Sequence, residues 1–574
     1  MEPALKLESS LWVGNKRYRA VLTGWKFNWT EVDKKNRDKK TISVSVADII
    51  GVEDGQVCIL PHKSSEDADK DFTVFYVKRI RSGSSHGLLW RLGRTQFSCP
   101  SRVLRDQWTK HLRAALKTHS PLRPSRLLVF INPFGGKKRG RDIYHSLVAP
   151  VFELAGISCH VIVTERANQA RDHLLKKDLT SFDGVVCVGG DGMFSEVLHG
   201  VIHRTQQEAG LCENDPAVSL QPCPLHIGII PAGSTDCVCY ATVGVIDPVT
   251  SALHIIIGDS QPLDVCSVHH ANTLVRYSVS LLGYGFYGDV LAESEKHRWM
   301  GPLRYDYAGT MVYLNNRSYA GIVQFLPADP LLSSPRDKTR CLSGSTERLF
   351  PHSPDASSFY SSHLSQINGD SDGDWVSVEG KFRCVSLTCM SCSCPRSPLG
   401  LSPSAHLADG TGDLILVWDT HPLAFLKYLY RHTSTQDRFD LPFVEVHRVK
   451  AVRFSVLSNE VEEAYKEVGE STEVEAAAAE EDGGYVEDIS RNGSQQRLTE
   501  KLGGHPKATC TPLCGLCCRT APTLSVWNCD GEILPFTDIL CRIHGQLVRL
   551  YARGIEDAAA MHGYKDGMVK CERQ

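Results

Sequence analysis

The sequence predicts three successive units: a small β-barrel closed by one helix, an α/β domain with a parallel sheet, and a mostly antiparallel β domain. Three observations support this fold class. Short β-type runs broken by polar turns fill about the first hundred residues. Apolar strands alternate with helical stretches in the next segment, and β-type runs dominate the rest. A chain of 574 residues is also too long for one compact unit.

The first unit is predicted at residues 1–120. Its β-type runs are 10–13, 18–22, 41–46, 72–77 and 95–97, and a helical pattern with Trp108 on its apolar face follows at 101–117. A barrel closed by such a helix resembles a pleckstrin-homology domain. Residues 1–120 contain 22 Lys and Arg against 13 Asp and Glu. This excess predicts a surface for anionic lipid head groups or nucleic acid, with a merely solvated basic face as the alternative.

The α/β domain is predicted at residues 125–260, after a linker at 121–124. Apolar runs at 127–131, 159–163, 185–188 and 227–230 are typical of buried strands, and helical stretches lie at 168–177 and 194–204. Alternation of this kind predicts a parallel sheet with its ligand site at the carboxyl ends of the strands.

The third unit is predicted at residues 261–574 as β-rich and without regular helices. Its β-type runs include 275–282, 320–325, 414–418 and 449–454. Two segments near 327–374 and 459–509 lack the apolar residues of a core and are predicted to be disordered insertions. The chain is expected to re-enter the fold at 523–534 and 546–551 and to complete a site there.

The sequence contains neither a secretory leader pattern nor an apolar run of about 18 residues. We therefore expect a cytoplasmic and peripheral membrane protein. Its 21 cysteines are then expected to be free thiols rather than disulfides.

The strongest local motif follows the apolar run 185–188. Gly189, Gly190, Asp191, Gly192 and Met193 stand between that strand and a helix, where glycine lets backbone amides approach phosphate oxygens. An aspartate would repel phosphate, so Asp191 is predicted to accept a proton from an attacking hydroxyl or to help hold a metal. The alternative is a turn that uses Gly and Asp only for their conformations.

Two similar turns follow other predicted strands. The first consists of Asn132, Pro133, Phe134, Gly135 and Gly136, and the second runs from 231 to 236 with Gly233 and Ser234 at its centre. Neither is a Walker A loop, because the glycine spacing and the Ser or Thr after Lys are missing. Three such turns at the carboxyl ends of parallel strands are expected to converge on one site.

In this order and spacing, NPFGG, GGDGM and PAGSTD resemble the catalytic domain shared by diacylglycerol, sphingosine and ceramide kinases. The resemblance runs from about residue 126 to the end of the chain apart from the two insertions. It implies ATP and Mg²⁺ as cofactors, with Asp191 as catalytic base. Other implied nucleotide-binding residues are Asn132, Pro133, Phe134, Gly135, Gly136, Thr164, Glu165, Arg166, Ala167, Asn168, Glu196, Gly233, Ser234, Arg298, Arg304, Asp530, Gly531 and Glu532.

The same resemblance implies that the lipid contacts Gly189, Gly190, Asp191, Gly192, Met193 and Asp289, and it leaves the metal ligands unassigned. Among the branches, ceramide kinases are most similar, because they combine the pleckstrin-homology unit with this catalytic domain. The zinc modules usual in diacylglycerol kinases are absent upstream. Sphingosine kinases have a second acid where this chain has Leu291.

The implied reaction is transfer of the γ-phosphate of ATP to the primary hydroxyl of ceramide, giving ceramide 1-phosphate. The alternatives are a sphingosine or diacylglycerol kinase, or a non-catalytic lipid-binding adaptor. The resemblance also implies membrane phosphoinositides as ligands of the barrel, Ca²⁺ as an activator, and the Golgi or plasma membrane as location. No nucleic-acid partner is expected.

Two further patterns have competing interpretations. Cysteines at 389, 392 and 394, and at 510, 514, 517 and 518, could bind zinc, but their spacing favours free or lipid-modified thiols. The stretch 423–432 could be a short amphipathic helix that binds calmodulin, or a helix packed in the core.

Overall fold

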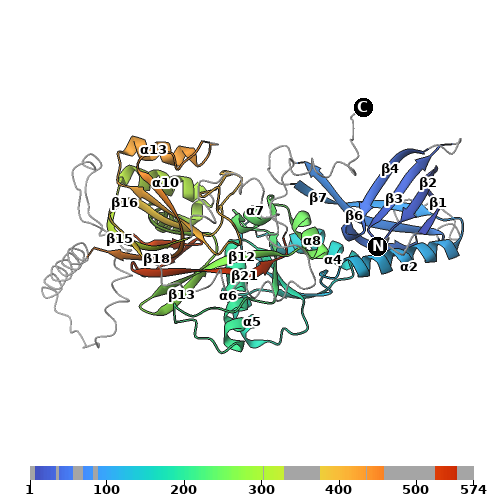
Figure 1. Ribbon diagram of the computed structural model, residues 1–574, viewed down its shortest axis with the longest axis horizontal. Helices are drawn as coiled ribbons and strands as arrows, with labels where there is room; N and C mark the ends of the chain where they lie inside the picture. Colours follow the sequence, from blue (N-terminus) through green and yellow to red (C-terminus); the bar gives the residue numbers. More distant parts are fainter. Residues whose placement is uncertain are drawn as a thin grey trace.

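The computed structural model describes residues 7–33, 38–55, 69–81, 88–136, 138–301, 303–328, 375–397, 399–434, 436–457 and 524–552. The molecule is elongated, with the N-terminal sheet at one end, the parallel sheet in the middle and the antiparallel lobe at the other end (Figure 1). Apart from residues 327 and 328, both predicted insertions lie outside the described residues.

The N-terminal unit is an antiparallel sheet with one C-terminal helix, as predicted, but it has seven strands, and two of them, Lys26–Val32 and Ile49–Asp54, were not among the predicted runs. The strand order is β4-β3-β2-β1-β7-β6-β5. Helix α2 (Arg102–His119) buries Trp108 completely, and the indole Nε1 donates a hydrogen bond to Oγ of Ser9 at 2.8 Å. The strands are β1 (Leu7–Val13), β2 (Lys16–Leu22), β3 (Lys26–Val32), β4 (Asp38–Ser45), β5 (Ile49–Asp54), β6 (Asp71–Arg81) and β7 (Leu88–Ser98).

The middle unit contains the four predicted parallel strands, in the order β9-β8-β10-β11. Buried side chains of alternate strand positions pack against α5 and α6 on one face, and against α4 and α8 on the other. The strands are β8 (Arg126–Ile131), β9 (Ser158–Val163), β10 (Gly184–Gly189) and β11 (His226–Pro231). The helices are α3 (Gly140–Ile143), η2 (Tyr144–Val148), α4 (Ala149–Leu154), α5 (Gln169–Lys176), α6 (Asp191–Glu208), α7 (Cys237–Val243) and α8 (Pro248–Ile257).

The last unit is a largely antiparallel sheet, which confirms the predicted fold class. Its strands are β12 (Gln261–His270), β13 (Thr273–Ser278), β14 (Leu281–Gly285), β15 (Tyr319–Pro327), β16 (Val376–Thr388), β17 (Gly412–Trp418), β18 (Val444–Val456), β19 (Trp527–Cys529), β20 (Glu532–Leu534) and β21 (Ile539–Leu550).

The prediction that this unit lacks regular helices is wrong. It contains α9 (Phe286–Lys296), η3 (Arg298–Met300), α10 (Leu303–Asn315) and α13 (Pro422–Arg431). Helix α9 starts directly after β14 and includes Gly288, so its beginning reads as a continued strand or turn. Helix α10 has apolar residues on more than one face, which hides the helical period.

Strand β21 joins the parallel lobe to the antiparallel lobe. It pairs in parallel with β11 through Arg549 and Leu550, and antiparallel with β12 along most of its length. Its first residues pair with β18 of the antiparallel lobe. The predicted return of the chain therefore completes one continuous sheet that runs through both lobes.

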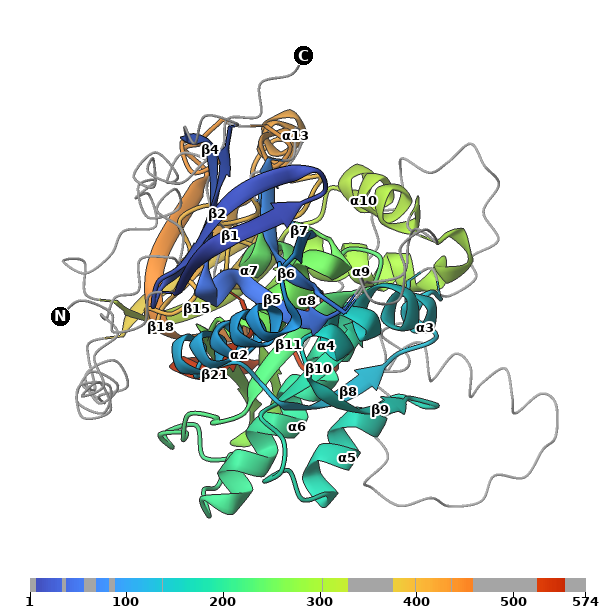
Figure 2. The same cartoon turned by 90° about the vertical axis from the view of Figure 1, so that its right-hand side faces the viewer.

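The N-terminal sheet packs directly on the parallel lobe. Ile50 and Trp90 belong to the same buried cluster as Leu253 and Ile256 of α8. Figures 1 and 2 show β7 and α8 side by side. Within the predicted linker, the guanidinium of Arg123 donates to the carbonyls of Ile49 and Ile50 at 2.6 and 3.0 Å, so this segment is fixed against β5.

Within the described part of the chain, no single helix is long and apolar enough to cross a membrane. The pair α7 and α8, bent by 56°, passes that test of length and composition only when the two helices are taken together.

Candidate active site

The three glycine-containing turns lie side by side because β8, β10 and β11 are neighbours in the sheet. The amide of Asn132 donates to the carbonyl of Val188 at 2.9 Å. The amide of Ala232 donates to the carbonyl of Gly189 at 3.0 Å. The structure thus brings the turns that follow β8, β10 and β11 together at one edge of the sheet.

The turns approach one another so closely that only glycine fits at their contacts. A Cβ atom on Gly233 would lie 2.5 Å from Cα of Gly190. Gly136 has φ +54°, and its Cβ would lie 2.7 Å from the carbonyl oxygen of Ala232. The resulting surface is mostly backbone, which is the kind of surface that binds phosphate oxygens.

Asn132 holds the first turn in shape. Its Oδ1 accepts hydrogen bonds from the amides of Phe134 and Gly135 at 2.9 and 3.1 Å, across the intervening Pro133. Phe134 is 63% exposed. Asn132 therefore positions the loop, and the loop presents an aromatic ring at the rim of the site.

Asp191 is the first residue of α6 and faces the first turn of α7. Its Oδ2 accepts from the amide of Cys237 and its Oδ1 from the amide of Val238, both at 3.0 Å. Burial raises the pKa of Asp191, and the charge of Asp530 adds to this rise, while the two amides oppose it. The carboxyl group is fixed in position and more basic than an exposed aspartate, which suits a proton acceptor.

Asp236 is a second acid at this edge, at the end of the third turn. Its Oδ1 accepts from the amide of Gly233 at 3.0 Å, and its φ is +52°. Burial raises the pKa of Asp236 to about 7, and the charge of Asp191 contributes to the rise. Asp236 is the last residue of the PAGSTD motif, but no role was predicted for it. A second acid beside a glycine turn is the pattern that could have marked it as a site residue.

The segment 164–168 leads from β9 into α5. The hydroxyl of buried Thr164 donates to the carbonyl of Ile131 at 3.2 Å, which joins this segment to the end of β8. Arg166 is paired with Asp172 at 2.7 Å, and Asn168 has φ +60° before the helix begins. The other two residues predicted here are Glu165 and Ala167.

Glu196 projects from α6 toward the start of α5. The amides of Asn168 and Ala170 favour its charged form, yet burial raises its pKa and the charge of Glu532 adds to the rise. Its Oε2 is buried and has no hydrogen-bond partner among the described residues. A buried acceptor without a donor is costly, so the site fits a ligand with a hydroxyl or amino group at this point, as a nucleoside has.

Asp530 lies in the turn between β19 and β20. Its carboxylate accepts hydrogen bonds from the hydroxyls of Ser278 and Ser280 and from the amides of Val279, Ser280 and Leu281, at 2.7–3.1 Å. These bonds fix the late acidic turn to the start of β14. Because its charge also raises the pKa of Asp191, the turn lies near that carboxyl group.

Glu532 is connected to α6 by a residue that sequence reasoning missed. The guanidinium of Arg276 donates to both carboxylate oxygens of Glu532, at 2.8 Å to Oε1, and to Oγ of Ser195 at 2.9 Å. Arg276 lies on β13, outside every motif, so no local pattern marks it. Gly531, with φ +90°, permits the tight turn between the two acids.

The two predicted arginines meet on one carboxylate. Arg298 and Arg304 both pair with Glu295, and Arg304 also donates to the hydroxyl of Tyr305 at 2.7 Å. The side chain of Arg298 is 74% exposed. Neither guanidinium has a hydrogen bond to the three turns within the described parts of the chain.

Asp289 lies on α9 beside a small pocket in the antiparallel lobe. Oδ1 accepts from the hydroxyl of Ser525 at 2.6 Å, and Oδ2 accepts from the hydroxyl of Tyr319. Burial raises the pKa of Asp289 despite these bonds. Arg317 and Phe425 contribute to the wall of the pocket. Its lining combines aromatic and aliphatic residues with the polar side chains of Asp289, Asn316 and Arg383, so the pocket suits the polar end of a ligand.

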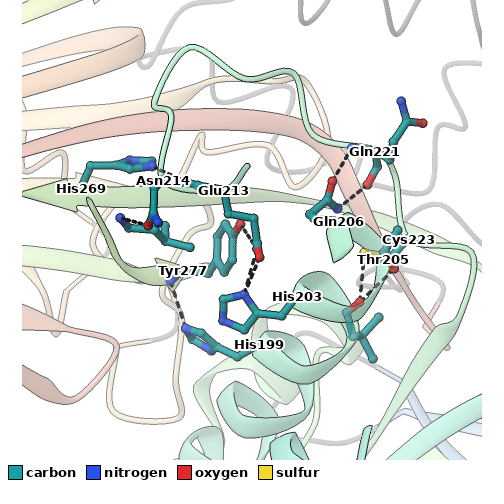
Figure 3. Close-up of polar contacts among 12 residues, drawn as sticks. His199, His203, Thr205, Gln206, Glu213, Asn214, Gln221, Cys223, His269 and Tyr277 are labelled. Atoms are coloured by element: carbon teal, nitrogen blue, oxygen red, sulfur yellow. Dashed lines mark hydrogen bonds and ion pairs between the residues drawn. The ribbon is translucent and has the colours of Figure 1, made fainter. Parts of the chain in front are cut away.

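A buried polar cluster anchors the middle of α6 to β13 (Figure 3). His199 Nδ1 lies 2.7 Å from the carbonyl of Ser195, and its Nε2 accepts from the amide of Tyr277 at 3.0 Å. Burial lowers the pKa of His199 to about 3, so the ring is neutral. Tyr277 donates to Glu213 at 2.6 Å, and His203 contacts the same carboxylate at 2.8 Å. The cluster holds the helix that begins with Asp191.

The cysteine motifs do not form a metal centre in the described residues. Cys389 is buried, and Cys392 and Cys394 are partly exposed. No group of three or more His, Cys, Asp or Glu is placed to hold a metal ion in the part that the structure describes. The second cysteine group, at 510–518, lies outside the described residues.

A parallel lobe with three glycine turns at one edge, joined to an antiparallel lobe that returns an acidic turn beside them, defines a lipid kinase of the diacylglycerol kinase class. The family model "Diacylglycerol kinase catalytic domain" matches residues 126–268. The models "Ceramide kinase C-terminal domain" and "Ceramide kinase PH domain" match residues 280–490 and 7–112.

The chain is 44% identical over 573 residues to "Ceramide kinase" of Homo sapiens, which covers 96% of this chain and 97% of that protein. It is 44% identical over 575 residues to "Ceramide kinase" of Mus musculus, which covers 97% and 99%. The chain belongs to the ceramide kinase family. Among solved structures, a diacylglycerol kinase from Bacillus anthracis str. Sterne covers 76% of this chain and 99% of its own, with a TM-score of 0.43 and 12% identity.

These findings confirm the family resemblance and the order of its units. A pleckstrin-homology domain of this family indicates peripheral association with a membrane.

Proposed function

We propose that this protein transfers the γ-phosphate of ATP to the primary hydroxyl of ceramide, giving ceramide 1-phosphate, with Asp191 as the general base. The observation that supports this most directly is the position of the Asp191 carboxylate. It lies at the meeting point of the three turns, and two amides of α7 orient it. In this family the lipid substrate is ceramide by name.

In the proposed reaction, the triphosphate lies along the three turns and the nucleoside extends toward segment 164–168. Oε2 of Glu196 accepts a hydrogen bond from the nucleoside, which satisfies its buried lone pairs. Asp191 takes the proton of the lipid hydroxyl as its oxygen attacks the γ-phosphorus, and ADP leaves on the opposite side. The backbone amides of the glycine turns and the two arginines stabilise the charge on the transferred group.

Magnesium fits this site as an ion held by one carboxylate and the phosphates. No protein cage of three acids exists among the described residues, and Mg²⁺ normally binds through one or two carboxylates plus substrate phosphates. Asp236 would hold the ion, because this acid lies beside the turns. Its Oδ1 alone accepts the hydrogen bond from the amide of Gly233 that orients the side chain. When bound, the ion neutralises phosphate charge. The five donors to Asp530 give that residue a fixed structural task instead.

The lipid is proposed to enter from the side of Asp289, with Gly192 and Met193 near its head group. Gly192 is exposed and has open space around it, whereas Met193 is buried beneath. Leu291 is 4% exposed on α9, so an apolar side chain occupies the position where sphingosine kinases have a second acid. This supports a neutral amide lipid over a charged sphingoid base.

The barrel is proposed to bind membrane phosphoinositides at the Golgi or plasma membrane. Support comes from its family match and from the excess of basic residues in its sequence. Activation by Ca²⁺ and binding of calmodulin to α13 stay predictions. A calcium-dependent pull-down with purified calmodulin tests the second of these.

The test of the proposed function is phosphate transfer from Mg-ATP to ceramide, sphingosine and diacylglycerol in detergent micelles, with wild type and Asp191→Asn. Phosphorylated ceramide from the wild type alone supports both the reaction and the base. Preference for another lipid shifts the substrate. No transfer to any lipid by folded protein supports a lipid-binding adaptor.

A further inference from the structure

Helix α13 is apolar on two opposite faces. Phe425 and Tyr428 are buried against the lobe, whereas Leu423, Leu426 and Tyr430 are 68%, 46% and 66% exposed. The exposed residues are spaced by three and four positions, so they form one stripe along the helix. A helix on the surface of a globular lobe normally shows polar residues on its outer face. The outer stripe of α13 therefore needs a partner.

Helix α10 shows the same arrangement. Ala308 and Val312 point into the lobe. Residues on the opposite side recur at intervals of four, four and three, and the short helix η3 just before them exposes 82% of Trp299. The exposed apolar residues at these intervals are Leu303, Tyr307, Met311 and Leu314, and the polar residues Asp306 and Thr310 are exposed beside them.

The two helices are neighbours and are joined by a hydrogen bond. The hydroxyl of Tyr313 on α10 donates to the carbonyl of Pro422 at the start of α13, at 3.3 Å. Both helices lie at the end of the molecule that is opposite the N-terminal sheet (Figure 1). We define the apolar ridge as the exposed side chains of Trp299, Leu303, Tyr307, Met311, Leu314, Leu423, Leu426 and Tyr430.

Helices α10 and α13, which carry most of the apolar ridge, also line the pocket beside Asp289. Val312 and Tyr313 of α10 and Phe425 of α13 line that pocket, and each belongs to a helix that presents ridge residues on its outer side. The ridge and the pocket are therefore built on opposite sides of the same two helices.

Basic side chains border the apolar ridge. Arg317 and Lys427 are exposed, and so are Arg396 and Lys296, which pair with Asp306 and Glu293. Aliphatic and aromatic residues surrounded by Lys and Arg are the composition of helices that lie in the membrane interface. The cations suit phosphate head groups, and their alkyl stems extend the apolar surface.

We propose that the apolar ridge inserts into the lipid bilayer, with its side chains among the upper acyl segments and its bordering cations at the head groups. The lipid then reaches Asp289 without leaving the membrane. This inference rests on the proposed function in one respect, that the substrate is a membrane lipid. The exposed Lys and Arg residues at its border complement the charge of anionic lipid head groups, and this favours the bilayer over a second copy of the chain as the occupant.

The test is sedimentation of the full-length protein with vesicles of phosphatidylcholine and phosphatidylserine, without nucleotide and without phosphoinositide. The variant carries Leu314→Ser, Leu423→Ser and Tyr430→Ser. The control carries Leu147→Ser and Val161→Ser, which are exposed residues of the parallel lobe. We expect vesicle partitioning of the ridge variant to fall roughly tenfold or more, and that of the control to stay within about twofold.

Thermal unfolding verifies that both variants are folded, and the single change Leu423→Ser repeats the test with minimal disturbance. Unchanged partitioning of the folded ridge variants would overturn the proposal. Two other outcomes would also overturn the proposal if vesicle partitioning stays unchanged. If the ridge variant changes from a dimer into a monomer, the ridge binds a second copy of the chain. If the variant loses calmodulin binding, the ridge binds calmodulin.

A second readout separates this proposal from the proposed function. The ridge variant should phosphorylate ceramide embedded in vesicles roughly tenfold more slowly, and a short-chain ceramide in micelles at nearly the wild-type rate. If wild type phosphorylates neither, the proposed function fails, while the vesicle-binding result still decides the role of the ridge. An equal loss of rate with both substrates would contradict membrane docking.

Discussion

The indole of Trp90 stacks on the imidazole of His254, with the ring centroids 3.8 Å apart and the planes inclined by 23°. Trp90 lies on β7 and His254 on α8. Around this pair, the amide of Trp90 donates to Oγ1 of Thr250 at 3.0 Å, and Arg91 pairs with Asp247 at 2.7 Å. Because α8 follows α7, whose first amides orient the carboxylate of Asp191, the pleckstrin-homology unit packs on a support of the candidate active site.

Replacing Trp90 by Ala should lower the free energy of unfolding by about 3–5 kcal/mol, since the indole is fully buried. Lipid phosphorylation should fall as well, because α8 loses the ring that stacks on His254. Urea unfolding and the kinase rate measure the two effects. Trp25→Ala is the control, because Trp25 is 64% exposed and its loss should leave both values nearly unchanged. Equal effects of the two changes would refute the role of the stacked pair.

Asp191→Asn should reduce kcat by roughly 10²–10⁴-fold, because an amide does not accept the proton of the lipid hydroxyl. The asparagine keeps only one acceptor for the two amides of α7, so a loss of about 1–3 kcal/mol of stability is also expected. Steady-state kinetics with ceramide and thermal unfolding measure these effects. A kcat within threefold of wild type would exclude Asp191 as the base.

Asp236→Asn should stabilise the protein above pH 7. The pKa of Asp236 is raised from 3.8 to about 7, so between these values the unfolded chain has lost a proton that the folded protein keeps. Wild-type stability therefore falls as pH rises from about 4 to about 7, on the order of 2–4 kcal/mol for this group. Unfolding temperatures of both proteins, measured without nucleotide, should differ most above pH 7 and converge near pH 4. A constant difference would contradict this account.

Asp530→Asn should cost about 2–4 kcal/mol of stability, because its new amino group would face hydroxyl and amide donors that now point at a carboxylate. Glu532→Gln is the matched control, since Glu532 is about half exposed and is paired with Arg276. It should cost less than about 1 kcal/mol. Urea unfolding compares the two, and a milder effect at Asp530 than at Glu532 would argue against its structural task.

Gly233→Ala should impair both folding and nucleotide binding, because the added methyl would meet the backbone of Gly190 at 2.5 Å. Gly192→Ala should leave stability unchanged or raise it by up to about 1 kcal/mol, since open space surrounds this helical glycine. Its KM for the lipid should rise if the head group lies there. Thermal unfolding and titration with an ATP analogue separate the two variants. Normal nucleotide affinity in folded Gly233→Ala would contradict the proposed phosphate surface.

The strands and turns of the nucleotide edge could be predicted because their signals are local. Residues 185–193, for example, contain a buried strand, its glycine turn and the acid in one short stretch. Parallel pairing then places the turns together without further information.

Contacts between distant segments could not be predicted in the same way. Arg276 meets Glu532 across 256 positions of sequence, and no motif surrounds it. The buried position of Trp90 depends on α8, which follows more than a hundred residues later. Helix α10 could not be predicted for another reason. Its apolar residues lie on two faces, so the sequence lacks the clear 3.6-residue hydrophobic period that marks a surface helix.

The position of β21 also has a consequence for synthesis of the protein. Its neighbour β11 leaves the ribosome long before residues 539–550 exist, so the nascent parallel sheet has an open edge during most of translation. An unpaired edge of this kind can pair with the wrong strand. Premature stop codons upstream of β21 should therefore abolish the nucleotide lobe, even where all three glycine turns have already been translated.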